Sequence, residues 1–288
     1  DGALAMAMGH VMLKEFYVDR QVPYFQDYAR TFTDLPHLVR LEDAGDGNLR
    51  GGRFLRASDL GIEREHGEWC TALLDAKTGE IVIPNGSMGD RWGEEGEGRW
   101  NLELGDVEPA LSLLGHHEET ANVSIPVFAG DGPAKSFNVT RSVPVKRLAD
   151  GTLVTTVLDL SLAQYGVARD GLPGDWPASY DDDKPFTPAW QQLHTGIPAA
   201  EVITTAREFA RNAERTKGRS MIVMGAATNH WYHGDTIYRA MLNLLMLCGC
   251  QGVNGGGWAH YVGQEKVRPM AGFAQMAFAL DWGRPPRQ

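Results

Sequence analysis

The amino-acid sequence predicts an α/β fold in which parallel-sheet lobes flank a region rich in β-hairpins. Residues 185–288 alternate helical and strand patterns, the order typical of a parallel sheet with helices packed on it. Residues 43–184 instead contain dense glycine and short apolar runs, as hairpins and loops do. Apolar residues make up 43% of the 288, which is enough for a packed core.

The pattern of residues 1–42 predicts two helices and a strand. We interpret this segment as the end of one α/β lobe. Apolar residues recur at helical spacing over Ala3–Phe16, and Asp1 is placed to cap that helix. Val22–Phe32 predicts a second helix, because Pro23 suits a first helical turn. Asp34–Glu42 has the character of a strand.

Residues 43–184 predict an insertion of hairpins and loops. Cys70–Leu74 and Glu80–Ile83 flank a turn and should pair as a hairpin. Thr152–Leu160 has the best strand pattern of the region, and we expect a strand over its whole length. The acidic triplet Asp181–Asp183 precedes a proline and indicates a linker boundary; it is better explained by solvation than by a bound cation.

Residues 185–288 predict helix, strand, helix and a glycine-rich turn. A long helix begins at Pro198, and the uninterrupted apolar run Met221–Met224 indicates a buried parallel strand. Ile237–Leu247 is apolar on nearly every side, which predicts a helix buried all round. Without neighbouring lobes we expect three leucines of this helix to be exposed. They are Leu244, Leu245 and Leu247.

Charge and cysteine content narrow the class of protein. The formal net charge is −10, which argues against nucleic acid as a partner, since such proteins present a basic face. The three cysteines give no disulfide framework and favour a reducing compartment. The longest apolar run, Met241–Cys250, is too short to cross a bilayer. Because the sequence starts at Asp1 inside a helical pattern, we expect a segment of a longer chain.

The candidate binding site lies on two polar loops. The first follows the strand Met221–Met224 and displays imidazole and amide groups, and the second follows a cluster of glycines. Ligands of open α/β sheets sit beyond the carboxyl ends of strands, so we expect the two loops to converge there. Backbone N–H groups at Gly234–Asp235 and Gly255–Gly257 suit an anionic ligand such as a phosphate. The candidate residues are Met224, Gly225, Asn229, His230, His233, Gly257, His260 and Gln264.

Three alternatives remain open for these loops. His230 and His233, with Cys248, Cys250 or His260, could form a zinc site, but four ligands at the usual spacing are lacking and Cys248 suits a core position. The aromatic residues could be ordinary surface packing. The third alternative is a non-catalytic nucleotide-binding or interaction domain, although no GxGxxG fingerprint or P-loop is present.

The motifs Asn229–His233 and Gly255–Lys266 resemble the catalytic alpha subunits of membrane-bound respiratory nitrate reductases. The resemblance extends along nearly the whole chain. The further matching segments are Ala5–Met12, Pro84–Ser87, Arg91–Glu94, Leu113–Gly115, Pro144–Leu148, Ser179–Asp182 and Phe278–Trp282.

The resemblance implies a body like that of dimethyl sulfoxide reductase, with lobes surrounding a molybdenum bis(molybdopterin guanine dinucleotide). Residues 185–288 would then be part of a pterin-dinucleotide-binding lobe, and the eight candidate residues part of its shell. It further implies reduction of nitrate to nitrite with electrons from quinol, a 4Fe-4S cluster, an iron–sulfur beta subunit and a membrane gamma subunit with haem b. The complex would sit at the cytoplasmic face of the bacterial membrane.

The resemblance also limits what this segment can do. The family's aspartate ligand to molybdenum and its cluster ligands match positions upstream of Asp1, so we assign no catalytic and no metal-binding residue here. We therefore expect the segment alone to be inactive, and residues 43–184 to be scaffold and subunit or channel surface. The alternative is a sister molybdoenzyme that reduces chlorate, perchlorate or selenate.

Overall fold

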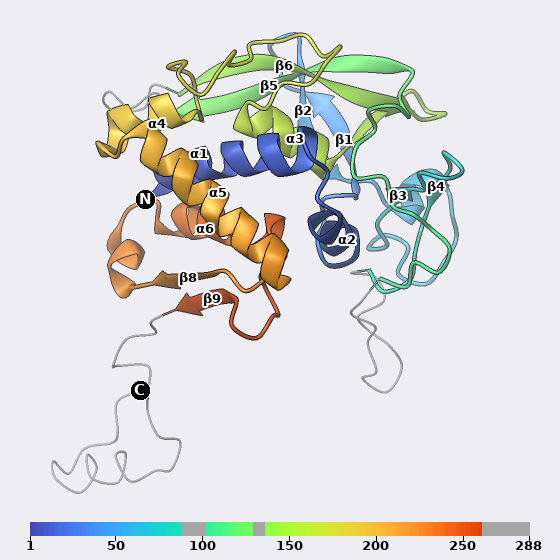
Figure 1. The fold of residues 1–288 in the computed structure, drawn as a ribbon. Coiled ribbons are helices and arrows are strands. Elements are labelled where there is room, and N and C mark those ends of the chain that lie inside the picture. The colour runs from blue at the N-terminus through green and yellow to red at the C-terminus, as the bar shows by residue number, and fades with distance from the viewer. Residues whose placement is uncertain (88–101, 129–135, 261–288) are drawn as a thin grey trace, which may run out of the picture.

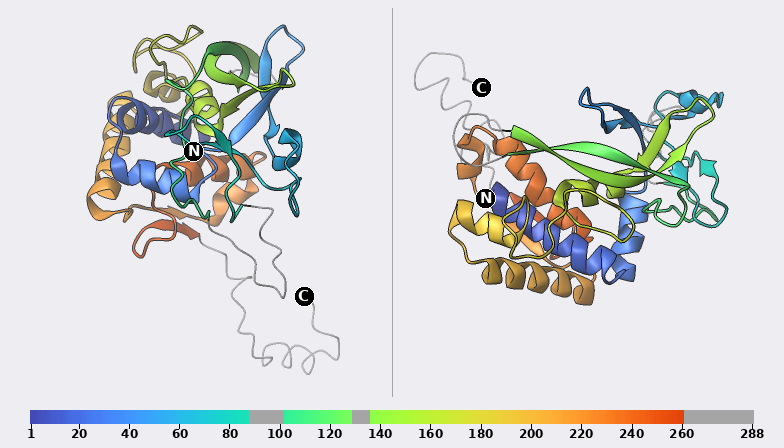
Figure 2. Two further views of the ribbon diagram at one scale, coloured as in Figure 1. Left: turned by 90° about the vertical axis from the view of Figure 1, so that its right-hand side faces the viewer. Right: turned by 90° about the horizontal axis from the view of Figure 1, so that it is seen from above.

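The computed structural model describes residues 1–87, 102–128 and 136–260. A β-barrel lies at the top of Figure 1, a layer of helices lies below it, and a small two-stranded sheet lies beneath the helices. Figure 2 shows the long strands of the barrel crossing over the helical layer. Mixed helices and sheets confirm the predicted α/β class. Among the described residues, no helix is long and apolar enough to span a membrane.

The barrel combines β1, at the end of the first segment, with four strands of the hairpin-rich region, and it closes on itself in the order β1-β2-β5-β6-β7. The hairpin of β5 and β6 is its longest antiparallel pair, and β1 joins β7 to β2. A separate short hairpin, β3 with β4, confirms the predicted pairing of the segments around residues 73 and 82. The strands are β1 (Leu38–Asp43), β2 (Leu49–Phe54), β3 (Leu73–Leu74), β4 (Ile81–Val82), β5 (Glu119–Phe128), β6 (Ser136–Arg147) and β7 (Leu153–Thr156).

The prediction of one strand over Thr152–Leu160 is wrong in its second half. Strand β7 ends at Thr156, and helix α3 (Val157–Tyr165) begins directly after it. The Thr156 hydroxyl accepts a hydrogen bond from the Asp159 backbone N–H at 3.0 Å, which is the standard way to cap a helix. The capping pair of a threonine and an aspartate three residues apart therefore starts a helix, although the β-branched residues around it favour a strand.

The N-terminal helices confirm their predicted positions. Helix α1 (Gly2–Leu13) continues as a π-helical turn (Lys14–Val18), and α2 (Pro23–Phe32) follows with its proline in the first turn. Asp1 stands at the capping position of α1, but its side chain makes no capping hydrogen bond. Most of α1 is buried, because it packs against α3, α4, α5 and α6.

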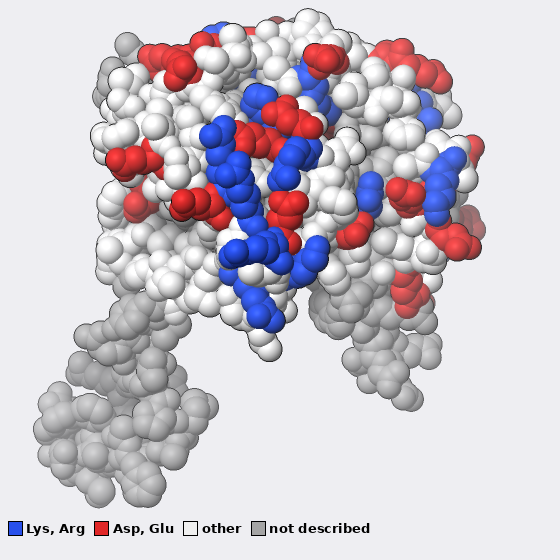
Figure 3. All heavy atoms as spheres, viewed as in Figure 1, with Lys and Arg blue, Asp and Glu red and all other residues white. Residues whose placement is uncertain are grey.

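Two more helices form the outer part of the helical layer: α4 (Pro188–Thr195) and α5 (Ala199–Thr216). The Thr187 hydroxyl caps α4 by accepting a hydrogen bond from the Trp190 N–H at 3.1 Å. α5 buries a stripe of small residues and turns its arginines outward. Figure 3 shows Lys and Arg side chains gathered along this face, with acidic side chains among them. Arg207 of α5 pairs with Glu15, and Glu214 of the same helix pairs with Arg20 from the N-terminal segment.

The last part of the fold is a β-α-β unit: strand β8 (Met221–Met224), a 3-10 turn (Ala226–His230), helix α6 (Gly234–Leu247) and strand β9 (Gly257–His260). β8 and β9 are parallel, as the predicted unit requires. The prediction of a fully buried strand is wrong, because Met221 is 45% and Val223 76% exposed. The described helices cover only the other face of this sheet.

Helix α6 also differs from its prediction. It is buried on one side, at Leu244, Leu245 and Leu247, whereas Asp235 and Arg239 are exposed. The expected exposure of those three leucines is therefore wrong, since each is 0% exposed. Helix α1 supplies the apolar surface that covers them.

Candidate functional site

The parallel register of β8 and β9 decides which candidate residues lie together. Met224 pairs with His260 at the carboxyl end of both strands, and Met221 pairs with Gly257 at the amino end. The loop 225–233 leaves from the carboxyl end of β8, so it lies beside His260. This juxtaposition agrees with the predicted convergence of the two histidine-bearing segments.

The glycine-rich turn does not join this edge. Residues 249–256 lead into the amino end of β9, so this part of the predicted convergence is wrong. The glycines serve close packing instead: a Cβ on Gly256 would lie 2.0 Å from the Gly218 carbonyl oxygen. The Gly257 N–H donates to the Ser220 carbonyl at 3.0 Å and is not free for an anion.

Three rings form an aromatic cluster at the carboxyl edge. The Tyr238 hydroxyl lies 2.8 Å from Nε2 of His260. The His260 ring stacks over Trp258 with centroids 6.2 Å apart and an interplanar angle of 9°. Tyr238 lies 5.3 Å from Trp258, centroid to centroid, and so closes the cluster from α6. A histidine held on two sides in this way has a fixed ring plane.

A shallow hollow of about 580 Å³ opens beside this cluster. It lies between the first turns of α6 and the end of β9. Its size falls in the range of small-molecule sites, which are commonly lined by aromatic groups and a few polar ones. Trp231 is 56% and Tyr232 94% exposed, so two large rings are available to a planar ligand. The lining residues are Trp231, Tyr232, Gly234, Asp235, Tyr238 and His260.

Of the described candidate residues, His260 is the one that lines this hollow. Met224 is buried, and its sulfur lies 3.4 Å from the Thr228 hydroxyl. Gly225 precedes the 3-10 turn that contains Asn229 and His230, and the His230 side chain is exposed. His233 is exposed at the start of α6 and contacts the Tyr232 ring edge at 4.5 Å between centroids. The Asn229 side chain and the whole of Gln264 lie outside the described structure.

Sequence reasoning missed Tyr238. The helical stretch that contains it is apolar enough to indicate a helix of the hydrophobic core. A tyrosine in such a stretch is expected to pack in that core and not to line a binding site. The available signal was its place one turn after Gly234, in the part of α6 that starts from the histidine-bearing loop.

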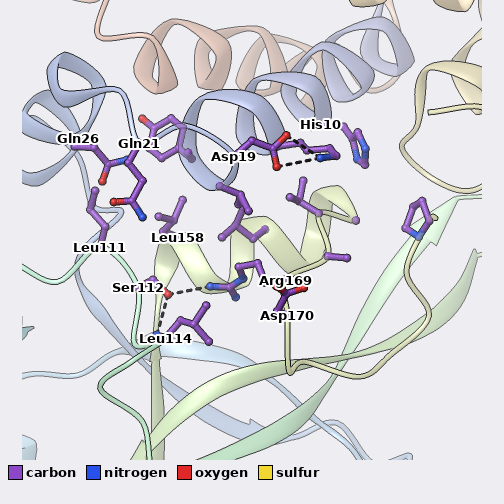
Figure 4. A pocket seen from close by; sticks show the side chains of 18 of the residues that line it. His10, Asp19, Gln21, Gln26, Leu111, Ser112, Leu114, Leu158, Arg169 and Asp170 are labelled. Carbon is purple, nitrogen blue, oxygen red and sulfur yellow. Dashed lines mark hydrogen bonds and ion pairs between the residues drawn. The ribbon is translucent and has the colours of Figure 1, made fainter. Parts of the chain in front are cut away.

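A larger hollow of about 700 Å³ lies between α1 and α3, and Figure 4 shows its lining. Its wall contains a buried ion pair: Arg169 Nη1 donates to Asp159 Oδ1 at 2.5 Å and to Ser112 Oγ at 2.9 Å. Asp159 also accepts from the Leu113 N–H at 2.8 Å. This network fixes the start of α3 against the loop that follows β4, which indicates a structural role.

His10 also lines this larger hollow. Its Nδ1 lies 2.7 Å from the Tyr165 carbonyl oxygen. Burial lowers the pKa of His10 to about 4, so the ring is neutral at pH 7. No predicted candidate residue lines this hollow.

Metal-binding side chains do not gather among the described residues in groups of three or more. Cys248 and Cys250 are buried, and burial raises the pKa of both thiols. The Cys248 sulfur lies 3.7 Å from that of Met12 in the helical core, as the core interpretation predicts. His260 already bonds Tyr238. The described geometry therefore gives no support to the zinc alternative.

A family model for molybdopterin oxidoreductases matches residues 1–287. The chain belongs to the molybdopterin oxidoreductase family. Over 295 residues this molybdopterin oxidoreductase chain is 55% identical to the nitrate reductase alpha subunit of Mycobacterium tuberculosis, with 100% of the chain and 24% of that protein covered. It is 51% identical over 307 residues to the respiratory nitrate reductase 1 alpha chain of Escherichia coli, again covering 100% and 24%.

A more distant relative is the perchlorate reductase subunit alpha of Dechloromonas aromatica, 29% identical over 280 residues, with 96% of this chain and 24% of that protein covered. The molybdopterin oxidoreductase chain thus spans about a quarter of the length of the curated relatives it matches. These similarities confirm the resemblance to nitrate reductase alpha subunits that the motifs indicate.

Proposed function

We propose that this chain is part of the catalytic alpha subunit of a respiratory nitrate reductase, and that the carboxyl edge of β8 and β9 holds part of its molybdenum–pterin cofactor. The observation that carries the site is the meeting of loop 225–233 with His260 beside an aromatic-lined hollow. The identity of 50–55% to nitrate reductase alpha chains supports the reaction.

The hollow suits the organic part of a pterin dinucleotide. Pterin and guanine rings are planar and stack on exposed aromatic side chains such as Trp231 and Tyr232. Both rings present an edge of N–H groups, and the Asp235 carboxylate can accept hydrogen bonds from them. The N-terminus of α6 opens on the same edge, and its first amides suit a phosphate. We therefore assign to this edge the ring of a pterin or guanine with a phosphate next to it.

We assign no metal ligand to this chain, because the described residues contain no group of three or more metal-binding side chains. The molybdenum of such a cofactor supplies the oxygen-atom transfer that converts nitrate to nitrite. The residues of this chain bind the organic part, fix its orientation and exclude water from one side. On this basis the chain alone is expected to be inactive.

The finer features of the complex belong to the same proposal. They are the bis(guanine dinucleotide) form of the cofactor, a 4Fe-4S cluster, quinol as electron source, an iron–sulfur beta subunit, a haem-b gamma subunit, and a place at the cytoplasmic face of the membrane. The relatives' designation as alpha subunits and alpha chains supports the presence of partner subunits.

A substitution at the sheet edge tests the site. In a protein of the relatives' full length, we expect His260→Ala to reduce pterin and molybdenum content about tenfold, since it removes a hydrogen-bonding ring and its stack on Trp258. Nitrate reduction by reduced viologen should fall in proportion. The control is His194→Gln, because His194 is an exposed histidine on α4. Full pterin content in the His260→Ala protein would contradict the assignment of this sheet edge as a cofactor site.

Kinetics with alternative oxyanions test the reaction. Nitrate should give the highest kcat/KM among nitrate, chlorate, perchlorate and selenate in the full complex. A clear preference for perchlorate would favour the function named for the relative with 29% identity.

A further inference from the structure

Tyr238 has a hydroxyl group whose one hydrogen needs an acceptor. Nε2 of His260, at 2.8 Å, is the contact that this hydroxyl makes among the described residues. If the hydroxyl donates, Nε2 carries a lone pair and the proton of the neutral ring lies on Nδ1. A tyrosine that donates in this way would select one of the two tautomers of the histidine.

The ring that is selected in this way is also fixed in orientation. His260 stacks on Trp258 at an interplanar angle of 9°, and Tyr238 approaches it from α6 at 5.4 Å between centroids. Nδ1 has no hydrogen-bond partner among the described residues, although Nε2 does. The ring therefore has one nitrogen held by the protein and one without a partner among the described residues, and His260 lines the hollow.

We propose that Tyr238 is a positioning residue: it holds His260 as the Nδ1–H tautomer and so presents an N–H donor to an oxygen acceptor of the bound dinucleotide. The acceptor class is a phosphate oxygen or a ring carbonyl oxygen, both of which the proposed cofactor contains. The role of this donor rests on the proposed function, whereas the state of the ring does not. Asp235, on the same wall, is an acceptor and cannot replace this donor.

Two amide substitutions separate the nitrogens of the ring. The asparagine side-chain NH₂ falls near the position of Nδ1, and the glutamine NH₂ falls near that of Nε2. In the full-length protein we expect His260→Asn to retain pterin within about threefold of the original protein, and His260→Gln to lose about tenfold. The reverse order would overturn the tautomer assignment while leaving the site in place. If His260→Ala keeps its pterin, the proposed site fails instead.

Covalent labelling tests the hydrogen bond without relying on the cofactor. Diethyl pyrocarbonate reacts with the lone pair of a neutral imidazole, which Tyr238 engages at Nε2. In cofactor-free full-length protein, Tyr238→Phe should raise the labelling rate of His260 about fivefold, the size expected from one neutral hydrogen bond. Labelling of His230 and His233, followed by mass spectrometry in the same sample, should not change.

The matched control is Tyr28→Phe. The Tyr28 hydroxyl lies 2.9 Å from the Gln251 carbonyl oxygen and 4.0 Å from the Met246 sulfur, at the opposite end of the β-α-β unit. This substitution should leave the labelling rate of His260 and the pterin content unchanged. An equal labelling rate of His260 in the original and Tyr238→Phe proteins would refute the positioning role.

Discussion

Two buried histidines show how single residues make this protein sensitive to acid. His10 is 3% and His37 8% exposed, and burial lowers the pKa of each to about 4. In an unfolded chain a histidine has a pKa of about 6.5. Between these two values the unfolded state binds protons that the folded state does not, so folding loses free energy there.

We therefore expect the contribution of these two histidines to the free energy of unfolding to be constant above pH 6.5. It should fall as the pH drops from 6.5 toward 4. Each histidine accounts for up to about 3 kcal/mol of that loss. His37→Leu should remove one of the two contributions, because burial is the cause of its shift. Urea unfolding at several pH values measures this. Parallel pH profiles for the original protein and the variant would contradict it.

At the scale of elements, the β8-α6-β9 unit is buried on one side and open on the other. Leu244 on α6 is 0% exposed, while Val223 on β8 is 76% exposed. Alternation along β8 turns Ile222 and Met224 toward the helices and Met221 and Val223 away from them. The continuous apolar pattern of the strand does not reveal this difference.

The difference predicts unequal costs for two apolar truncations. Leu244→Ala should lower the free energy of unfolding by about 2–5 kcal/mol, because it leaves a cavity against α1. Val223→Ala should cost less than about 1 kcal/mol, since its side chain contacts mostly solvent. Chemical unfolding of both variants provides the measurement. Similar losses at the two positions would mean that Val223 is covered in solution.

At the scale of the whole molecule, one apolar core draws on all three segments of the sequence. It contains Val11 and Phe16 from residues 1–42, Leu158 from residues 43–184, and Val202 and Leu245 from residues 185–288. The three-part division of the chain stays a prediction about its organisation. The shared core indicates that helix α1 is needed by the segments that follow it.

We expect a chain that lacks residues 1–42 to lose cooperative unfolding, because α4, α5 and α6 would lose the helix they pack against. Residues 1–288 serve as the reference in thermal unfolding followed by circular dichroism. Binding of a hydrophobic dye should rise, as Leu244 and Leu247 become exposed. A sharp transition in the truncated chain would show that the later segments fold without α1.

The sequence by itself determined the helices and strands with clear spacing, the short hairpin around residues 73 and 82, and, through the motifs Asn229–His233 and Gly255–Lys266, the family. These features depend on residues close together in the chain, so a local pattern records them. The tertiary structure decided which end of the sheet each loop reaches, which face of β8 is open, and that Tyr238 meets His260. Those outcomes depend on pairing and packing between distant segments, and the spacing of residues within one segment carries no record of them.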